Sequence, residues 1–265
     1  MNKLKFPLLF KGFTESDKKK GIEIIKSGQI TMSNLTKKFE KEFAKTVGAK
    51  YALMVNSGSS ANLLAAFASC NPMRKNRFFY GQEFLIPAVC WPTSLWPFVQ
   101  AGLKPVFVDV DTETLNISII DLKRKINSKT KVIVLVHVLG MCSDLNEIRK
   151  ICKKRKIILI EDSCEAFGST YRKNFLGTLS DFGTYSFYYS HQITSGEGGM
   201  IVCQNSEDYE ILLSLRAHGW TRDFTDRKSS EKKFPKMDKR FLFINSGFNL
   251  RATEIQAAIA YNQFK

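Results

Sequence analysis

The sequence lacks any long apolar run. None of its 265 residues belongs to a stretch approaching the roughly 18 to 20 uncharged apolar residues that cross a bilayer. The first residues are basic, but Pro7 and Lys11 interrupt the short apolar run around them, which argues against a secretory signal. We therefore expect a soluble, intracellular protein of the cytoplasm, with no membrane partner.

Cysteine is scarce and scattered. The six cysteines form no C-x-x-C pair and stand far apart, at Cys70, Cys90, Cys142, Cys152, Cys164 and Cys203. This spacing offers no zinc or iron–sulfur ligand set, and the thiols of an intracellular protein stay reduced. We expect no bound metal, and most of these side chains should be small core residues.

Acidic residues are also few in proportion: 25 stand against 40 lysines and arginines, for a net charge of +15. Such an excess can indicate nucleic-acid binding. However, the lysines are scattered over expected helix surfaces and loops, and no helix-turn-helix spacing, zinc-finger spacing or basic stripe with interleaved aromatics is present. We interpret the charge as a solvated surface that also suits an anionic substrate, and we expect no nucleic-acid partner.

Short β-rich runs alternate with helical patterns from about residue 50 onward. The expected strands are 51–55, 83–87, 105–108, 131–137, 156–161, 183–187 and 199–203, and the expected helices between them are 60–70, 91–101, 119–126, 145–154 and 207–217. The runs 132–136 and 157–160 are apolar throughout, which is typical of strands covered on both faces. The pattern predicts an α/β fold, a three-layer sandwich with a mostly parallel sheet.

The segments outside this alternation are less regular. Residues 15–27 and 35–47 are amphipathic helices by their spacing, and the polar stretch 220–239 is expected to be a mobile loop. A last helix is expected to start near Ala252. Its apolar side chains need a partner surface that the sequence does not obviously supply: Ile255, Ala258, Ile259 and Phe264.

The first segment with chemical potential is N-S-G-S-S-A-N at residues 56–62, which follows a strand and opens a helix. A junction of this kind presents backbone N–H groups, hydroxyls and the positive helix end to an anion. The G-x-x-x-x-G-K pattern of a Walker loop is absent. Asn and Ser also simply cap helices, so phosphate binding and capping both remain open.

The second segment places a carboxylate at the end of an expected central strand. Asp162 lies in I-E-D-S-C-E-A at residues 160–166, and ligands bind at the carboxyl edge of parallel sheets. Asp162 could be a metal ligand, a general base or the partner of a protonated heterocycle. It could equally cap a helix or form an ion pair.

The third segment, residues 186–199, is the densest in polar and aromatic side chains. A strand ends there, a polar aromatic loop follows, and a pair of glycines restarts the chain. A histidine alone is more often structural, as we expect of His137 at another strand end. His191, however, stands among Ser186, Ser190 and Thr194 before a Gly-rich exit, which favours a functional role.

Together with P-A-V-C-W at residues 87–91 and G-F-N-L-R at residues 247–251, these segments resemble the DegT/DnrJ/EryC1/StrS family of sugar aminotransferases and dehydratases. The resemblance runs from about Gly28 to Lys265 and implies the large domain of a fold-type-I enzyme dependent on pyridoxal 5'-phosphate. It divides the chain into an N-terminal helical segment (1–48), a cofactor-binding large domain (49–250) and the start of a helix (251–265). That helix would lead to a small C-terminal domain, which the chain largely lacks.

The resemblance also implies a phosphate site and a partner. Ser57, Gly58, Ser59 and Ser186 would hold the cofactor phosphate. Asn249 would reach the phosphate held by a neighbouring subunit, because the family forms dimers with shared active sites. A homodimer is therefore expected.

Three further residues would surround the cofactor ring in such a site. Trp91 would stack on the pyridine. Asp162 would pair with the protonated ring nitrogen and make the ring an electron sink. Glu165 would lie near the ring hydroxyl.

The sequence departs from the family at one position. Where the aminotransferases have S-F-x-x-x-K, residues 186–191 read S-F-Y-Y-S-H. The imidazole of His191 cannot bond covalently to the cofactor as a lysine amine does, but it can move protons near neutral pH. The resemblance then implies a lyase acting with pyridoxamine 5'-phosphate on a 4-keto sugar. His191 would take a proton from the cofactor's C4′, the 3-hydroxyl would leave, and a 3-deoxy ketone and ammonia would be released.

Two histidine-bearing subgroups of the family share this chemistry. The CDP-4-keto-6-deoxyglucose 3-dehydratases hold an iron–sulfur cluster on cysteines that follow the active-site strand, whereas residues 215–239 contain no cysteine. The wording R-A-H-G-W-T-R at residues 216–222 favours the other subgroup, the GDP-4-keto-6-deoxy-D-mannose 3-dehydratases of deoxysugar and lipopolysaccharide O-antigen biosynthesis, which regenerate pyridoxamine from glutamate.

The substrate would then be a nucleotide sugar, with His218 near the sugar and Arg222 near the diphosphate. Either residue could instead be a loop residue in an ion pair. A relative without catalysis, truncated or serving as a scaffold subunit, is the main alternative to an enzyme.

Overall fold

Seven strands form the central sheet of the protein, which the computed structural model describes at residue 9 and residues 11–265. The sheet order is β1-β9-β8-β5-β4-β2-β3. In chain order the strands are β1 (Tyr51–Val55), β2 (Glu83–Pro87), β3 (Lys104–Val108), β4 (Thr130–Val136), β5 (Ile158–Asp162), β8 (Phe182–Ser186) and β9 (Gly199–Cys203). β9 runs antiparallel to β1 and β8, and the other neighbours pair in parallel. The predicted, mostly parallel sheet is confirmed.

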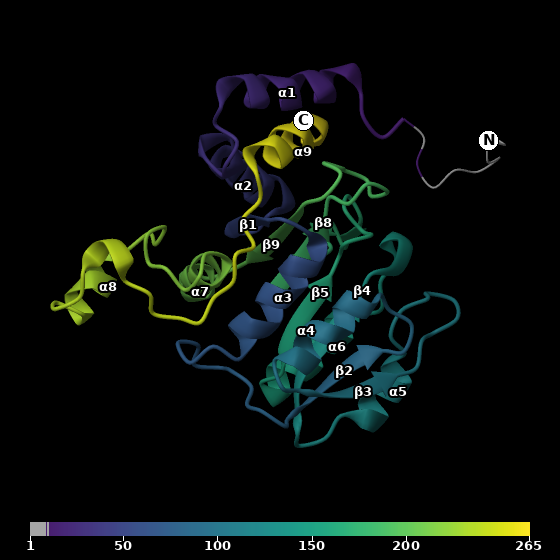
Figure 1. The fold of residues 1–265 in the computed structure, drawn as a ribbon. Helices are drawn as coiled ribbons and strands as arrows, with labels where there is room; N and C mark the ends of the chain where they lie inside the picture. The colour runs from purple at the N-terminus through teal and green to yellow at the C-terminus, as the bar shows by residue number, and fades with distance from the viewer. Residues whose placement is uncertain (1–8, 10) are drawn as a thin grey trace.

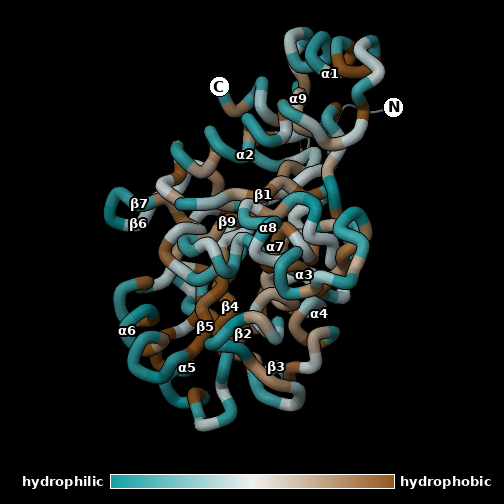
Figure 2. The backbone as a smooth tube through the Cα atoms, turned by 90° about the vertical axis from the view of Figure 1, so that its left-hand side faces the viewer, coloured by the Kyte–Doolittle hydropathy of each residue, from teal (hydrophilic) through white to brown (hydrophobic). Residues whose placement is uncertain are grey.

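Helices cover both faces of this sheet (Figure 1). On one face lie α3 (Gly58–Ser69), α4 (Pro92–Gln100) and α7 (Ser206–Arg216); on the other lie α2 (Asn34–Val47), α5 (Ile119–Lys125), α6 (Leu145–Arg155) and α9 (Glu254–Phe264). The all-apolar runs of β4 and β5 are buried between the layers, where Figure 2 shows the most hydrophobic part of the chain. The predicted three-layer sandwich is therefore confirmed.

The last helix, α9, has a partner surface within the chain. α1 (Glu15–Ser27) packs along it (Figure 1), and Asn262 of α9 donates a hydrogen bond to Asp17 at 2.7 Å. The ring of Phe264 lies 5.4 Å from that of Phe39 and 5.5 Å from that of Phe43, both on α2. The expectation that the apolar face of this helix lacks an obvious partner is wrong, because the two N-terminal helices cover it.

One carboxylate fastens these terminal elements together. The cap residue of α2, Ser33, makes no side-chain capping bond, which leaves the first N–H groups of that helix without local partners. The buried side chain of Glu254 accepts from the N–H groups of Ser33 (2.7 Å) and Leu35 (2.6 Å) and from the hydroxyl of Thr36 (2.6 Å). A residue 218 positions away in the chain thus caps α2, and its negative charge suits the positive end of the helix.

Several short elements were not predicted. The stretch 220–239 contains α8 (Arg227–Lys233), so it is not wholly a loop, and η2 (Lys239–Phe241) follows it. A small hairpin joins β6 (Thr170–Tyr171) to β7 (Asn174–Phe175), and η1 (Val138–Gly140) follows β4.

Among the described residues no helix combines the length and the apolar character needed to span a bilayer. Residues 1–8 and 10, which include the basic start and Pro7 considered above for a secretory signal, lie outside the described part of the chain.

Candidate functional site

The carboxyl edge of the sheet brings together the three segments singled out from the sequence. β1, β5 and β8 end there at Val55, Asp162 and Ser186. The approach is close: a Cβ atom on Gly58 would lie 2.5 Å from the Cβ of Ser186 and 2.9 Å from the Sγ of Cys164. Only glycine permits this contact, so residues far apart in the sequence form one site.

The first turn of α3 offers several polar groups to an anion. Ser57 caps the helix by accepting from the N–H of Ser60 at 3.1 Å, so its capping role is real. Ser59 is exposed and donates to Thr93 Oγ1 at 3.1 Å, and Ser186 Oγ accepts from the N–H of Tyr188 at 3.2 Å. Backbone N–H groups at a helix start remain available to a phosphate. The arrangement is therefore compatible both with helix capping and with phosphate binding by this segment.

Asp162 is a buried carboxylate without a positive partner. Its side chain is 5% exposed. Oδ2 accepts from Asn62 Nδ2 at 2.8 Å and from Ser94 Oγ at 2.6 Å, and Oδ1 accepts from the Cys164 N–H at 3.1 Å. It forms no ion pair with any residue that the structure describes. Because an uncompensated buried charge is costly, the site favours a cationic group beside this carboxylate.

Three residues that orient Asp162 were missed in the sequence. Thr184 Oγ1 donates to Asn62 Oδ1 at 2.7 Å, which directs the amide N–H of Asn62 towards Asp162, and Ser94 supplies the other donor. Asn62 lies one helical turn after Gly58 and therefore on the same face of α3. That spacing was the available signal. No sequence signal marked Ser94 or Thr184, because their roles depend on how α4 and β8 pack.

His191 lies in the loop that follows β8. Its N–H donates to the carbonyl of Tyr188 at 3.0 Å, and the two rings lie 6.0 Å apart in an edge-to-face arrangement. At the far end of the loop, the N–H of Thr194 donates to the side chain of Gln263 on α9 at 2.9 Å. The last helix thus helps to position the loop that carries the imidazole.

The electrostatic surroundings of His191 suit a proton acceptor. Partial burial lowers the pKa of His191 below its ordinary 6.5, and the nearby charges of Glu165 and Asp162 oppose that shift. Glu165 itself accepts from the N–H of Leu139 at 3.2 Å, and its carbonyl accepts from Gln192 Nε2 at 2.8 Å. The imidazole is therefore neutral near pH 7 and lies beside the two predicted carboxylates.

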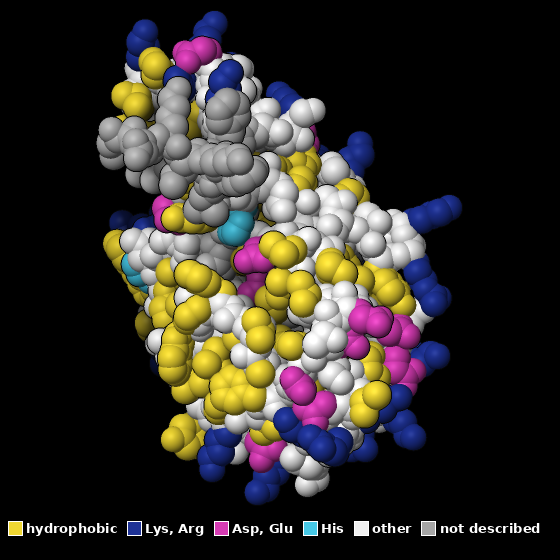
Figure 3. Space-filling model, turned by 90° about the vertical axis from the view of Figure 1, so that its right-hand side faces the viewer, with side chains coloured by type: hydrophobic (Ala, Val, Ile, Leu, Met, Phe, Trp, Pro, Cys, Tyr) yellow, Lys and Arg dark blue, Asp and Glu magenta, His cyan; other side chains and the backbone are white. Residues whose placement is uncertain are grey.

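The rim of this edge is apolar and exposed. Trp91, which begins α4 as its cap residue, is 70% exposed, and Val89 and Leu139 are 59% and 74% exposed. Burial and the charge of Asp162 both raise the pKa of Cys90, which places the strand-to-α4 turn near that carboxylate. Figure 3 shows hydrophobic side chains gathered around acidic ones and a histidine on one face. Such a surface is typical of a binding site.

The predicted substrate residues form a separate group. His218 adopts a left-handed conformation (φ 63°), and its Nε2 lies 3.4 Å from a guanidinium nitrogen of Arg251. Arg222 lies 4.2 Å over the ring of Trp220 and pairs with Asp223 at 3.4 Å. For Arg222 this matches the alternative of a loop residue in an ion pair.

Asn249 lies between the two groups. It forms a β-bridge with Ala217, and the carbonyl of Leu250 accepts from the N–H of Asn56 at 3.0 Å. The next residue, Arg251, forms a β-bridge with Val55. Asn249 is exposed beside the turn that opens α3, as a residue reaching a phosphate would be. Arg251 is a candidate that the sequence did not indicate.

His137 has the structural role expected of it. Its Nε2 lies 3.0 Å from Glu161 Oε1, and both side chains are buried. Glu161 also accepts from the N–H groups of Gly177 (3.0 Å) and Leu179 (2.8 Å). The N–H of His137 donates to the carbonyl of Asp162 at 3.0 Å. The pair fixes the end of β4 beneath the candidate site.

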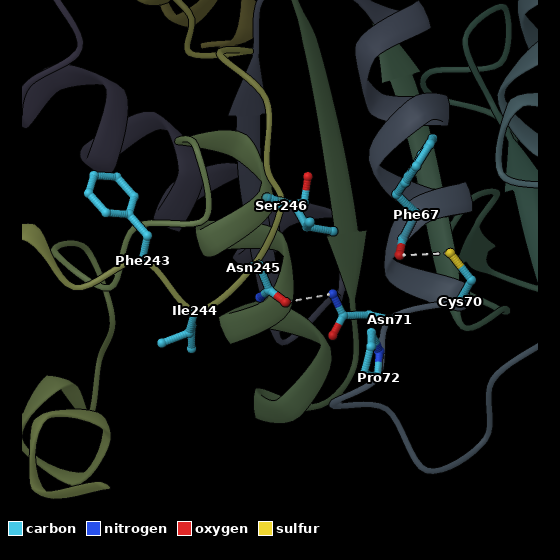
Figure 4. A pocket seen from close by; sticks show the side chains of 9 residues that line it. Phe67, Cys70, Asn71, Pro72, Phe243, Ile244, Asn245 and Ser246 are labelled. Carbon is cyan, nitrogen blue, oxygen red and sulfur yellow. Dashed lines mark hydrogen bonds between the residues drawn. The ribbon is translucent and has the colours of Figure 1, made fainter. Parts of the chain in front are cut away.

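A cavity of about 410 Å³ lies at the other end of α3 (Figure 4). It is bounded by the C-terminal end of that helix, by α7 and by residues 243–246. Asn71 Nδ2 donates to Asn245 Oδ1 at 3.1 Å, and Asn245 Nδ2 donates to Ser214 Oγ at 3.0 Å. It is therefore not part of the site around Asp162.

The residues at the carboxyl edge fit pyridoxal phosphate on two structural grounds. The close approach of Gly58 to Ser186 brings the start of α3 against the end of β8, so that the helix N–H groups and the Ser186 hydroxyl can face one phosphate. The buried, unpaired carboxylate of Asp162 lies where a protonated pyridine nitrogen would compensate it. His191 and Glu165 lie close to that carboxylate.

Comparisons with known proteins agree with this geometry. A model of the DegT/DnrJ/EryC1/StrS aminotransferase family matches residues 13–265. GDP-4-keto-6-deoxy-D-mannose 3-dehydratases of Escherichia coli O55:H7 and Yersinia pseudotuberculosis are 40% and 39% identical over 264 residues, which is 99% of this chain and 68% and 67% of theirs. The chain thus spans about two thirds of the length of these relatives.

Solved structures give the same result. A GDP-4-keto-6-deoxymannose-3-dehydratase variant with bound GDP-perosamine is 40% identical and matches 98% of this chain and 67% of its own, with a TM-score of 0.89. The same kind of enzyme with a trapped PLP-glutamate geminal diamine is 39% identical over 98% of this chain and 67% of its own, with a TM-score of 0.85.

Proposed function

The chain belongs to the DegT/DnrJ/EryC1/StrS aminotransferase family, and on this premise we propose that it acts as a nucleotide-sugar 3-dehydratase dependent on pyridoxamine 5'-phosphate. The substrate is a GDP-linked 4-keto-6-deoxyhexose, which loses its 3-hydroxyl. One observation carries the proposal: His191, at the position where the family's aminotransferases have lysine, has an imidazole within the electrostatic influence of Asp162 and Glu165.

The chain's own residues provide the cofactor site. When bound, the cofactor supplies an amino group for the sugar ketone and a ring that takes up electrons. Ser57, Gly58, Ser59 and Ser186 hold its phosphate at the start of α3. Asp162, held by Asn62, Ser94 and the Cys164 N–H, keeps the ring nitrogen protonated.

Proton movement falls to His191. Its lowered pKa keeps the imidazole neutral near pH 7, so that it can accept the proton from the cofactor's C4′ carbon. The resulting imidazolium is stabilised by the charges of Asp162 and Glu165. It can then deliver the proton to the 3-hydroxyl oxygen, which leaves as water. An imidazole cannot hold the cofactor covalently, so binding depends on the phosphate and ring contacts.

The remaining partners follow from the relatives. The GDP-perosamine and glutamate found in two related structures support a GDP-sugar as substrate and glutamate as the amino donor. Asn249 lies beside the α3 turn, where it could reach the phosphate of a second subunit, and His218 and Arg222 remain the proposed contacts to the sugar and the diphosphate. A homodimer with shared sites is part of the proposal.

Turnover with defined substrates tests the proposal. The protein is incubated with pyridoxal phosphate and glutamate, and ammonia release is followed after GDP-4-keto-6-deoxymannose is added. We expect release that depends on both additions and that is lost in a His191→Asn variant which still binds cofactor. Lys37→Gln, on the outer face of α2, is the control. Cofactor binding without ammonia above the His191→Asn level would contradict the proposal. Turnover only with CDP-4-keto-6-deoxyglucose would reassign the nucleotide, and failure to bind cofactor would favour the non-catalytic alternative.

A further inference from the structure

A large hollow lies at the amino edge of the sheet, opposite the edge that carries Asp162. Its volume is about 980 Å³, within the range of small-molecule sites. Its walls are α6, the starts of β5 and β8, the end of β9 and the loop at residues 75–76. Figure 2 shows α6 as a hydrophilic helix at the outer edge of the molecule. No part of the proposed catalytic mechanism uses this hollow.

Five cations line the hollow: Lys75, Arg149, Lys150, Lys153 and Lys156. All five are exposed, and none has an ion-pair partner among residues 9 and 11–265. On α6, Lys153 follows Arg149 by four residues and Lys150 by three, which places the three side chains on one face of the helix. The hollow therefore concentrates positive charge.

The one carboxylate in the lining offsets that charge only in part. Asp181 Oδ1 is bound to Arg74 at 2.6 Å, and its Oδ2 accepts from the N–H of Leu159 at 3.0 Å. Arg74 is also paired with Asp208 at 2.7 Å. Arg74 is thus shared by two carboxylates and the Asp181 side chain is 31% exposed, so the five exposed cations outnumber the one carboxylate that lines the hollow with them.

The helix dipole accounts for only part of this arrangement. Lys153 lies in the last turn of α6, where a cation complements the helix dipole, but Arg149 and Lys150 lie in the middle of the helix. Lys156 adopts the left-handed cap conformation (φ 55°), which usually selects glycine or asparagine. This conformation strains the backbone of a lysine.

The floor of the hollow differs from its rim. Cys152, Ile157 and Leu159 line it and are buried. A cationic rim over an apolar floor is suited to a small molecule that combines several phosphate groups with a flat or apolar part. We propose that this hollow binds a small polyphosphorylated molecule, of the class of a nucleoside triphosphate or an inorganic polyphosphate, at a site separate from the catalytic one.

Calorimetric titration of the full chain with ATP, with tripolyphosphate and with adenosine tests the proposal. We expect saturable binding of one equivalent of ATP or tripolyphosphate, weakened by added salt, and no binding of adenosine. Tighter binding of ATP than of tripolyphosphate identifies a nucleotide whose base uses the apolar floor. Equal affinity identifies the phosphate groups alone as the recognised part. Binding should persist when the catalytic site is filled with pyridoxal phosphate.

The variant R149Q/K150Q/K153Q should weaken binding about tenfold or more, which corresponds to about 1.4 kcal/mol, because it removes three of the five cations around the hollow. K37Q/K41Q/K45Q removes three exposed cations from one face of α2 and should leave the affinity unchanged. All six side chains are exposed, so both variants should fold, which circular dichroism checks. Equal weakening by the two variants would overturn the proposal, as would the absence of saturable binding. Binding only to RNA, with affinity that grows with its length, would also overturn it.

Discussion

Replacing Asp162 by asparagine separates cofactor binding from folding. The amide oxygen of the variant can still accept from Asn62 and Ser94. The N–H of Cys164, which donates to Asp162 Oδ1 at 3.1 Å in the original protein, would face the amide NH₂ instead. One lost hydrogen bond, partly offset by relief of the buried charge, should lower the free energy of unfolding of the cofactor-free protein by only about 1–2 kcal/mol. The charged hydrogen bond to the pyridine nitrogen would be lost entirely. That loss is about 1.5–3 kcal/mol, or roughly 10- to 150-fold in the dissociation constant.

Absorbance titration with pyridoxamine 5'-phosphate measures the dissociation constant, and urea unfolding without cofactor measures the stability. Asp121→Asn is the matched control. Asp121 accepts from the N–H of Asp109 at 2.8 Å and pairs with Arg124 and Lys125 on α5. Loss of this carboxylate should lower the free energy of unfolding without weakening cofactor binding. The reasoning is refuted if the Asp162→Asn variant binds the cofactor as tightly as the original protein does. It is also refuted if Asp162→Asn and Asp121→Asn weaken cofactor binding equally.

Three further outcomes are expected. Because burial lowers the pKa of His191, activity should rise with pH through a midpoint below 6.5. The variant Glu165→Gln removes a charge that raises this pKa and should move the midpoint lower still. An unmoved midpoint in the pH–rate profile would count against His191 as the base. Gly58→Ala should abolish cofactor binding in the same titration while the circular dichroism spectrum stays native, because the added methyl would meet Ser186. Glu254→Gln should cost about 2–3 kcal/mol in urea unfolding, since the charge accepts three close bonds at the start of α2; an unchanged midpoint would show that this cap is dispensable.

The sheet was predictable because its strands carry their own signal. Uniformly apolar runs such as residues 132–136 require cover on both faces, and the structure provides it. α8 could not be predicted in the same way. None of its residues is buried, and its supports are the Asp226 cap and the pair between Arg227 and Glu231 at 2.7 Å. The β6–β7 hairpin was hidden for another reason, because Arg172 and Lys173 adopt positive φ where glycine or asparagine is usual.

The candidate site shows a similar division. Asp162, Ser186 and His191 were found because each stands at a strand end or in the loop that follows it. Ser94, which holds Asp162 together with Asn62, lies inside α4, where a polar residue has no distinctive pattern, and for Asn62 the only signal was its spacing from Gly58. The fit between α9 and the two N-terminal helices was missed because no local spacing reveals a contact between the two ends of a chain.

The Glu254 cap also affects how the chain folds as it leaves the ribosome. Thr36 emerges 218 residues before Glu254, and at about 5–20 residues per second this interval lasts on the order of ten to forty seconds. Throughout it, α2 lacks its Glu254 cap, and α1 and α2 both lack the surface of α9 to pack on. Phe39 and Phe43, fully buried in the folded protein, lack the cover of Phe264 until α9 has emerged.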